Sequence, residues 1–180
     1  MIEKAKSVIH KVGPGLKKYQ DIMDGLQKVD VSRDAEFQIK YNGFYKVRQR
    51  EEKFYLTYYS YMEVCKSKGT DFEKTLRYLY SKLNRIEASF SSKLVATINS
   101  EMPIWDVYVL KNLDKKTPSQ YSKTRLEDTI NLYKEIVKWY SVFVKTNDGE
   151  EMIKIFDQNY PSNSISNTKK IDFILWQIRK

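Results

Sequence analysis

The sequence predicts an all-α protein. Almost every periodic segment carries apolar residues at the spacing of a helix face, and only residues 30–42 alternate as a strand does, at Phe37, Ile39 and Tyr41. No internal repeat, low-complexity tract or flexible linker divides the 180 residues. We therefore expect one domain over residues 1–180, a compact multi-helix unit that can form two helical lobes flanking a cleft.

The first half of the chain predicts four helices, at residues 2–12, 16–29, 47–67 and 72–84. Gly13, Pro14 and Gly15 are expected to end the first of them. Gly69 ends the third, and Asp71 caps the fourth. The fourth shows the clearest helical spacing, because its apolar residues are Phe72, Leu76, Leu79, Tyr80 and Leu83.

The second half predicts five further helices, at residues 93–99, 107–113, 123–145, 150–160 and after the capping candidates Ser166 and Asn167. A polar loop with Pro118 covers residues 114–122. The Asn147-Asp148-Gly149 sequence is expected to break the chain between two of these helices.

Composition restricts the class of protein. No apolar run is long enough to span a bilayer, and the N-terminus lacks the apolar region of a signal peptide, so we expect a cytoplasmic protein with no membrane contact. The single cysteine, Cys65, gives no sign of an oxidising compartment. The chain has one cysteine and one histidine, His10, so a Cys/His zinc site, which needs more such ligands, is excluded.

The charge balance favours a polyanionic partner. Lys and Arg outnumber Asp and Glu by 32 to 23, which gives a net charge of +9. The chain also has 14 tyrosines, whose rings can stack on unpaired bases, although packing between helices is the more common role. A basic cluster at Lys46, Arg48 and Arg50 precedes several aromatic residues and permits the same two interpretations, of which we favour packing: Phe54, Tyr55, Tyr58, Tyr59 and Tyr61.

Residues 87–110 carry the pattern that suggests chemistry. They predict a turn, a short helix that begins at Lys93, a proline loop, and a second helix that begins at Asp106. A lysine and an aspartate at two neighbouring helix starts can face one cleft, an arrangement suited to an amine nucleophile. The alternative is that Lys93 is a solvated surface group and that Asp106 only caps its helix, which contributes about 1 kcal/mol.

This order of elements resembles the core of the helix-hairpin-helix DNA glycosylases. The segment from Ser89 to Lys93 matches the hairpin and the lysine of that superfamily, and the segment from Pro103 to Asp106 matches its proline-aspartate loop. Ser89 and Ser91 stand where the hairpin has glycines, and the interval from lysine to aspartate is shorter than is typical. The similarity covers about twenty residues.

The resemblance implies a DNA glycosylase-like protein that excises a damaged base and can have abasic-site lyase activity, with no metal or organic cofactor. Lys93 would attack the sugar and form a Schiff base, and Asp106 would stabilise the positive charge on the sugar. Trp105 would wall the base pocket, with core packing as its alternative role. DNA contacts would come from the turn and from three further lysines: Ser89, Phe90, Ser91, Ser92, Lys111, Lys169 and Lys170.

Two other functions remain open at this point. One is a non-catalytic nucleic-acid-binding protein that keeps the fold without the glycine hairpin. The other is a helical protein-protein interaction module in which the lysines provide only solubility.

Overall fold

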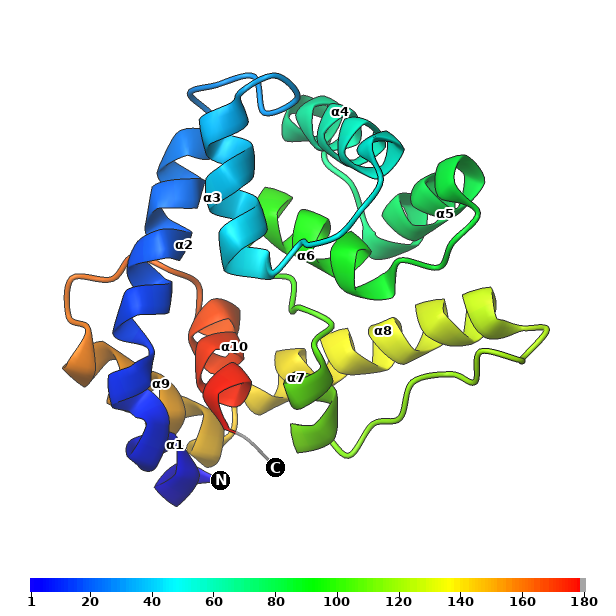
Figure 1. The fold of residues 1–180 in the computed structure, drawn as a ribbon. Coiled ribbons are helices and arrows are strands. Elements are labelled where there is room, and N and C mark those ends of the chain that lie inside the picture. Colours follow the sequence, from blue (N-terminus) through cyan, green and yellow to red (C-terminus); the bar gives the residue numbers. More distant parts are fainter. Residues whose placement is uncertain (179–180) are drawn as a thin grey trace.

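The computed structural model describes residues 1–178 and confirms the all-α prediction. Within these residues there are ten α-helices, one 3-10 helix and no strand, arranged as one compact unit (Figure 1). No helix of this part of the chain is long and apolar enough to cross a membrane. The helices are α1 (Ile2–Val8), η1 (Ile9–Lys11), α2 (Gly13–Leu26), α3 (Ala35–Tyr45), α4 (Glu52–Lys68), α5 (Phe72–Leu83), α6 (Ala88–Ile98), α7 (Val107–Asn112), α8 (Arg125–Phe143), α9 (Asn147–Asn159) and α10 (Asn167–Gln177).

Two helices are buried almost around their whole circumference. Every residue from 90 to 97 in α6 and from 168 to 175 in α10 is buried. A helix that is enclosed on all sides must be covered by several neighbours. Figure 1 shows α4 and α5 beside α6, and α1, α2 and α9 around α10, with α8 extending along one side of the molecule. The two candidate segments of the sequence analysis therefore lie in or beside the core.

Two of the tyrosines that follow the basic cluster, Tyr58 and Tyr59, lie inside the protein, and Tyr55 and Tyr61 are partly buried against its core. Tyr58 and Tyr59 are almost fully buried, and the Tyr58 hydroxyl donates to the carbonyl oxygen of Phe90 at 2.9 Å. The hydroxyl oxygens of Tyr58 and Tyr41 are 2.8 Å apart, and the Tyr59 hydroxyl donates to the side chain of Asn42 at 2.7 Å. Buried tyrosines need such polar partners, so the packing interpretation of this aromatic group is confirmed.

Residues 35–45 form a helix, although their alternation had left a strand open. The side chain of Asp34 caps this helix by accepting the Phe37 amide at 2.7 Å. Phe37 and Tyr41 point into the core because they lie four residues apart on one helix face, whereas Ile39 is 71% exposed. The apparent alternation came from an exposed isoleucine between two buried rings.

Two predicted breaks are helix starts. Gly13 and Pro14 begin α2, where a proline without an amide hydrogen is tolerated in the first turn. Asn147 begins α9, and the Thr146 hydroxyl oxygen caps this helix by accepting the Gly149 amide at 3.1 Å. The predicted breaks are present, since η1 ends at Lys11 and α8 at Phe143, but the next helices begin three residues earlier than the predicted starts at Leu16 and Glu150.

Candidate active site around Lys93

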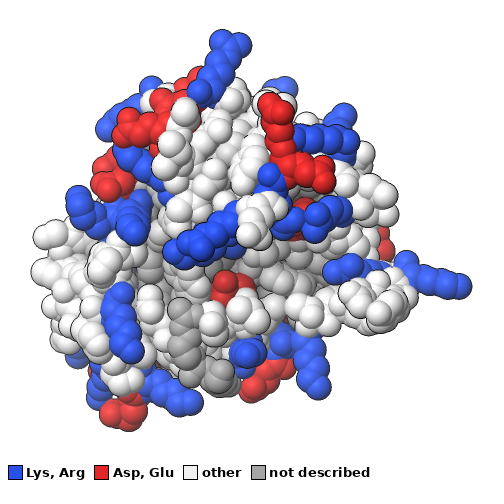
Figure 2. Space-filling view, viewed as in Figure 1, with Lys and Arg blue, Asp and Glu red and all other residues white. Residues whose placement is uncertain are grey.

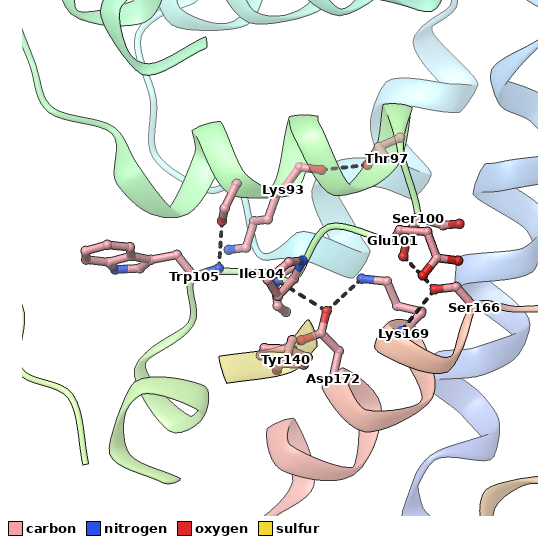
Figure 3. A network of polar contacts seen from close by, with 12 residues as sticks. Lys93, Thr97, Ser100, Glu101, Ile104, Trp105, Tyr140, Ser166, Lys169 and Asp172 are labelled. Atoms are coloured by element: carbon pink, nitrogen blue, oxygen red, sulfur yellow. Dashed lines mark hydrogen bonds and ion pairs between the residues drawn. The ribbon is translucent and has the colours of Figure 1, made fainter. Parts of the chain in front are cut away.

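Lys93 lies in the second turn of α6, in the interior of the protein. The predicted start of this helix at Lys93 was wrong, since α6 begins at Ala88. Only 8% of Lys93 is exposed, and its amine donates a hydrogen bond of 3.1 Å to the carbonyl oxygen of Tyr45. The amine also lies 5.1 Å from the centre of the Phe90 ring. Figure 3 shows the side chain directed from α6 toward the segment that carries Ile104 and Trp105.

The surroundings of Lys93 increase the fraction of the amine that is neutral. Burial lowers the pKa of Lys93 from 10.5 to about 8, because the charged form loses its hydration. The Asp106 carboxylate acts in the opposite direction, and the guanidinium of Arg50 lowers the pKa further. With a pKa near 8, about a tenth of the amines are neutral at pH 7, compared with far fewer for an ordinary lysine.

Asp106 caps α7 and also acts on Lys93. Its carboxylate accepts the Tyr108 amide at 2.9 Å, so the capping role anticipated from the sequence is present. Its negative charge raises the pKa of Lys93, and no ion pair joins the two groups within residues 1–178. Asp106 thus combines a capping hydrogen bond with a longer-range electrostatic effect on the amine.

Side chains from three helices fix the segment that precedes Asp106. The Tyr133 hydroxyl of α8 donates to the carbonyl oxygen of Pro103 at 2.7 Å. The amide of Ile104 donates to the Asp172 carboxylate of α10 at 3.2 Å. The amide of Trp105 donates to the Ser92 hydroxyl oxygen of α6 at 2.8 Å (Figure 3). A loop held in this way keeps its geometry without secondary structure of its own.

A buried ion pair supports the site from α10. The Lys169 amine lies 3.1 Å from the Asp172 carboxylate, and both side chains are at most 3% exposed. Asp172 also accepts the Tyr140 hydroxyl at 2.6 Å. Burial works against the charge on Lys169, but the Asp172 carboxylate raises the pKa of Lys169. Figure 3 shows this network on the α10 side of the Ile104 segment, opposite the helix that carries Lys93.

Sequence reasoning missed Asp172 as a site residue. The available signal was a carboxyl group within an otherwise apolar run, from Ile171 to Trp176. A charged side chain that is flanked by apolar residues on a core helix is buried with them. A buried charge needs a partner of opposite charge or a hydrogen bond. The predicted surface role of Lys169 does not fit this placement, because its amine faces the protein interior.

The predicted hairpin turn is part of a helix. Ser89, Phe90, Ser91 and Ser92 belong to the first turns of α6, and the Ser91 amide already donates to the carbonyl oxygen of Glu87 at 2.8 Å. Phe90, Ser91 and Ser92 are buried. The expected phosphate-binding turn at these residues is therefore absent. The reason is that a run of small and apolar residues continues the helix when no glycine interrupts it.

The remaining predicted residues occupy different surroundings. Trp105 is 6% exposed, and its ring lies parallel to the Phe72 ring at 6.3 Å, so it packs in the core. Figure 3 shows this ring directed away from Lys93. Lys111 is exposed in the last turn of α7. Lys170 is 9% exposed and forms an ion pair of 2.8 Å with Asp157 of α9.

A small cavity adjoins the Lys93 site. Tyr45, whose carbonyl oxygen holds the amine, lines it together with Ile104, Lys169 and Asp172, and Phe44, Phe173 and Trp176 complete the lining. Its volume of about 10 Å³ is close to that of a single water molecule. A nucleobase enters this space only when some of the surrounding rings move.

Comparisons with protein-family models, with curated protein sequences and with solved structures give no significant match.

Proposed function

We propose that this protein is a DNA glycosylase-like enzyme in which Lys93 is the nucleophile and Asp106 stabilises the charge on the sugar. The resemblance to the helix-hairpin-helix glycosylases, with serines at the glycine positions, suggested these roles. The observation that carries the proposal is the state of the amine: Lys93 is a buried lysine with a pKa lowered to about 8, within electrostatic reach of an aspartate at a helix start.

The reaction follows from this pair. The neutral Lys93 amine attacks the anomeric carbon of a damaged nucleotide, and the electrons of the glycosidic bond leave with the base, which takes up a proton. The attacking amine loses one proton, and the sugar ring then opens with a proton taken up by its oxygen, which gives a protonated Schiff base between Lys93 and the sugar. The negative Asp106 stabilises the positive charge that develops on the sugar during departure of the base. The chemistry needs no metal and no organic cofactor.

The hydrogen-bonded segment before Asp106 supports the proposal through preorganisation. A carboxylate stabilises a transition state best when it is already in position and does not have to be reoriented. Pro103, Ile104 and Trp105 are each fixed by a side chain of a different helix. The base would enter next to Tyr45 and Ile104, where the rings of Phe44 and Trp176 close the small cavity. Substrate binding therefore requires these rings to move.

Borohydride trapping on duplex DNA with an abasic site tests the proposal, because reduction of the Schiff base gives a stable covalent product. The wild-type protein is expected to form the adduct, and Lys93→Met, which keeps the length of the apolar stem, is expected to abolish it. Lys46→Met is the matched control. This lysine is exposed and follows Tyr45 directly, so it should leave trapping unchanged.

The alternatives give other outcomes of the same experiment. DNA binding that falls with salt, without any adduct, would identify a non-catalytic nucleic-acid-binding protein. Absence of DNA binding at low salt would favour the third function, a helical protein-protein interaction module. An adduct that survives in Lys93→Met would assign the trapped amine to another lysine and reject the proposed nucleophile.

A further inference from the structure

A polar groove passes the N-terminal end of α6. It consists of two adjoining hollows of about 230 and 390 Å³. Residues 49–54 contribute to the first hollow, residues 120–126 contribute to the second, and Arg85 and Glu87 line both. We name it the basic groove after its five basic lining residues, which are Arg50, Lys53, Arg85, Lys123 and Arg125.

The acidic residues of the groove do not cancel this charge. Glu87 is buried between two arginines, 3.1 Å from Arg50 and 3.4 Å from Arg85, so one carboxylate holds two guanidinium groups in place. Glu51 is the other acidic lining residue. Figure 2 shows Lys and Arg side chains extending across the middle of this face of the molecule. The groove therefore carries a net positive charge.

Three of the basic side chains are available to a ligand. Within residues 1–178, the side chains of Lys53, Lys123 and Arg125 have neither an ion pair nor a hydrogen bond. Lys53 and Lys123 are also exposed. Lysines without acidic partners along a groove are suited to a chain of phosphates, because each contact releases a counterion from the polyanion.

One aromatic ring, that of Phe90, lies close to both Arg50 of the groove and Lys93. The guanidinium of Arg50 lies 4.8 Å from the centre of the Phe90 ring, and the Lys93 amine lies 5.1 Å from the centre of the same ring. Arg50 is further fixed by the Phe54 ring at 5.3 Å. The Phe90 ring thus connects Arg50 of the groove with the buried Lys93 amine.

We infer that the basic groove binds the phosphate backbone of the DNA strand whose damaged base reaches Lys93. The inference rests on the proposed function and supplies the backbone contact that the helical residues 89–92 do not provide. Tyr121 is 86% exposed between two residues that line the groove, Gln120 and Ser122, where its ring can stack on a base of the bound strand.

A charge-reversal experiment tests the groove. The variant Lys53→Glu/Lys123→Glu changes one exposed lysine in each hollow and lowers the net charge from +9 by four, to +5. Lys28→Glu/Lys68→Glu is the matched control, with the same change in net charge. The contact of Lys66 with the Val29 carbonyl oxygen at 2.7 Å brings Lys28 and Lys68 to one end of the molecule. Lys68 is about 22 Å along α4 from Lys53.

The measurement is fluorescence anisotropy of a labelled duplex with a tetrahydrofuran abasic-site analogue, over a series of NaCl concentrations. In the groove variant we expect Kd to rise at least about tenfold, and the slope of log Kd against log salt to fall by about two. In the control variant Kd should remain within about threefold of the wild type. Thermal unfolding of each variant checks the fold, and Lys53→Ala/Lys123→Ala provides a milder second variant.

The outcomes separate the groove from the chemistry. Equal loss of binding in the groove and control variants would overturn the groove, while Lys93-dependent trapping would still support the glycosylase proposal. Selective loss in the groove variant, with no trapping by the wild type, would support the groove and reject the enzyme. Absence of wild-type binding at low salt would overturn both.

Discussion

The hydroxyl oxygen of Ser92 accepts a hydrogen bond of 2.8 Å from the backbone amide of Trp105. The residues that follow these two in the chain are Lys93 and Asp106. The Ser92 hydroxyl in turn donates to the carbonyl oxygen of Ser89 at 2.9 Å, so its orientation is fixed. A single side chain thus sets the position of the carboxylate-bearing segment relative to the helix that carries the amine.

Replacing Ser92 by alanine should weaken this link. The buried Trp105 amide would lose its acceptor, and we expect the free energy of unfolding to fall by about 1–3 kcal/mol in urea titrations. Ser141→Ala removes an exposed serine that donates to a carbonyl oxygen three residues earlier and should change stability by less than about 0.5 kcal/mol. Equal stability of Ser92→Ala and the wild type would show that the bond is not needed.

Lys93→Met should alter the pH dependence of stability. The folded pKa near 8 is lower than the ordinary 10.5, so between these values the unfolded chain binds more protons than the folded one. The contribution of Lys93 to stability therefore rises with pH across this window, by roughly 3 kcal/mol in total. The Met variant lacks this rise and should be more stable than the wild type at pH 7.

Urea titrations at pH 7 and pH 10 measure the effect as a difference between the two proteins. Lys138→Met, at an exposed position of α8, is the control and should follow the wild type at both pH values. A wild-type minus Met difference that does not change with pH would show that the amine has an ordinary pKa.

Breaking the buried ion pair should be costly. Asp172→Asn leaves the Lys169 charge without its partner in the interior, and we expect a loss of about 3–5 kcal/mol in the free energy of unfolding. Lys169→Met combined with Asp172→Asn removes both charges and should recover a large part of the loss. If the double variant is no more stable than Asp172→Asn, the unpaired charge is not the cause.

Two glycines should respond in opposite directions to alanine. A Cβ at Gly149 would overlap the carbonyl oxygen of Phe143, which belongs to the backbone and cannot turn aside, so we expect a loss of about 1–3 kcal/mol. A Cβ at Gly43 meets nothing within 4 Å on the exposed side of α3, and alanine there should stabilise by about 0.5–1 kcal/mol. Thermal unfolding measures both, and a stabilised Gly149→Ala would contradict the packing described here.

The helices were predictable where apolar residues recur along one face. The helix predicted at residues 72–84 is observed at Phe72–Leu83 with its cap at Asp71, and α10 begins after its predicted cap, Ser166. Helix boundaries were predicted wrongly where the prediction rested only on the presence of glycine, proline or asparagine. Gly13-Pro14 and Asn147-Asp148-Gly149 are compatible with both a helix end and a first turn, and tertiary contacts decide between these two.

The site was predictable only in part. The burial of Lys93 could not be predicted. A lysine in an otherwise small and apolar segment can lie on the exposed face of its helix or be enclosed with it. The Tyr45 carbonyl oxygen, which holds the amine, carries no sequence signal, since every residue has one. Arg50 belonged to a recognised basic cluster, but its contact with Phe90 joins residues 40 positions apart.

The complete enclosure of α6 between residues 90 and 97 determines how the protein can open. Amide hydrogens in such a helix exchange with deuterated water only when much of the surrounding packing is lost, so they should be among the slowest in the molecule. Any faster breathing that admits solvent to Lys93 must then take place in the elements that cover α6. The Lys93 amine thus belongs to the most enclosed part of the fold, and solvent reaches it only when the helices that cover α6 move.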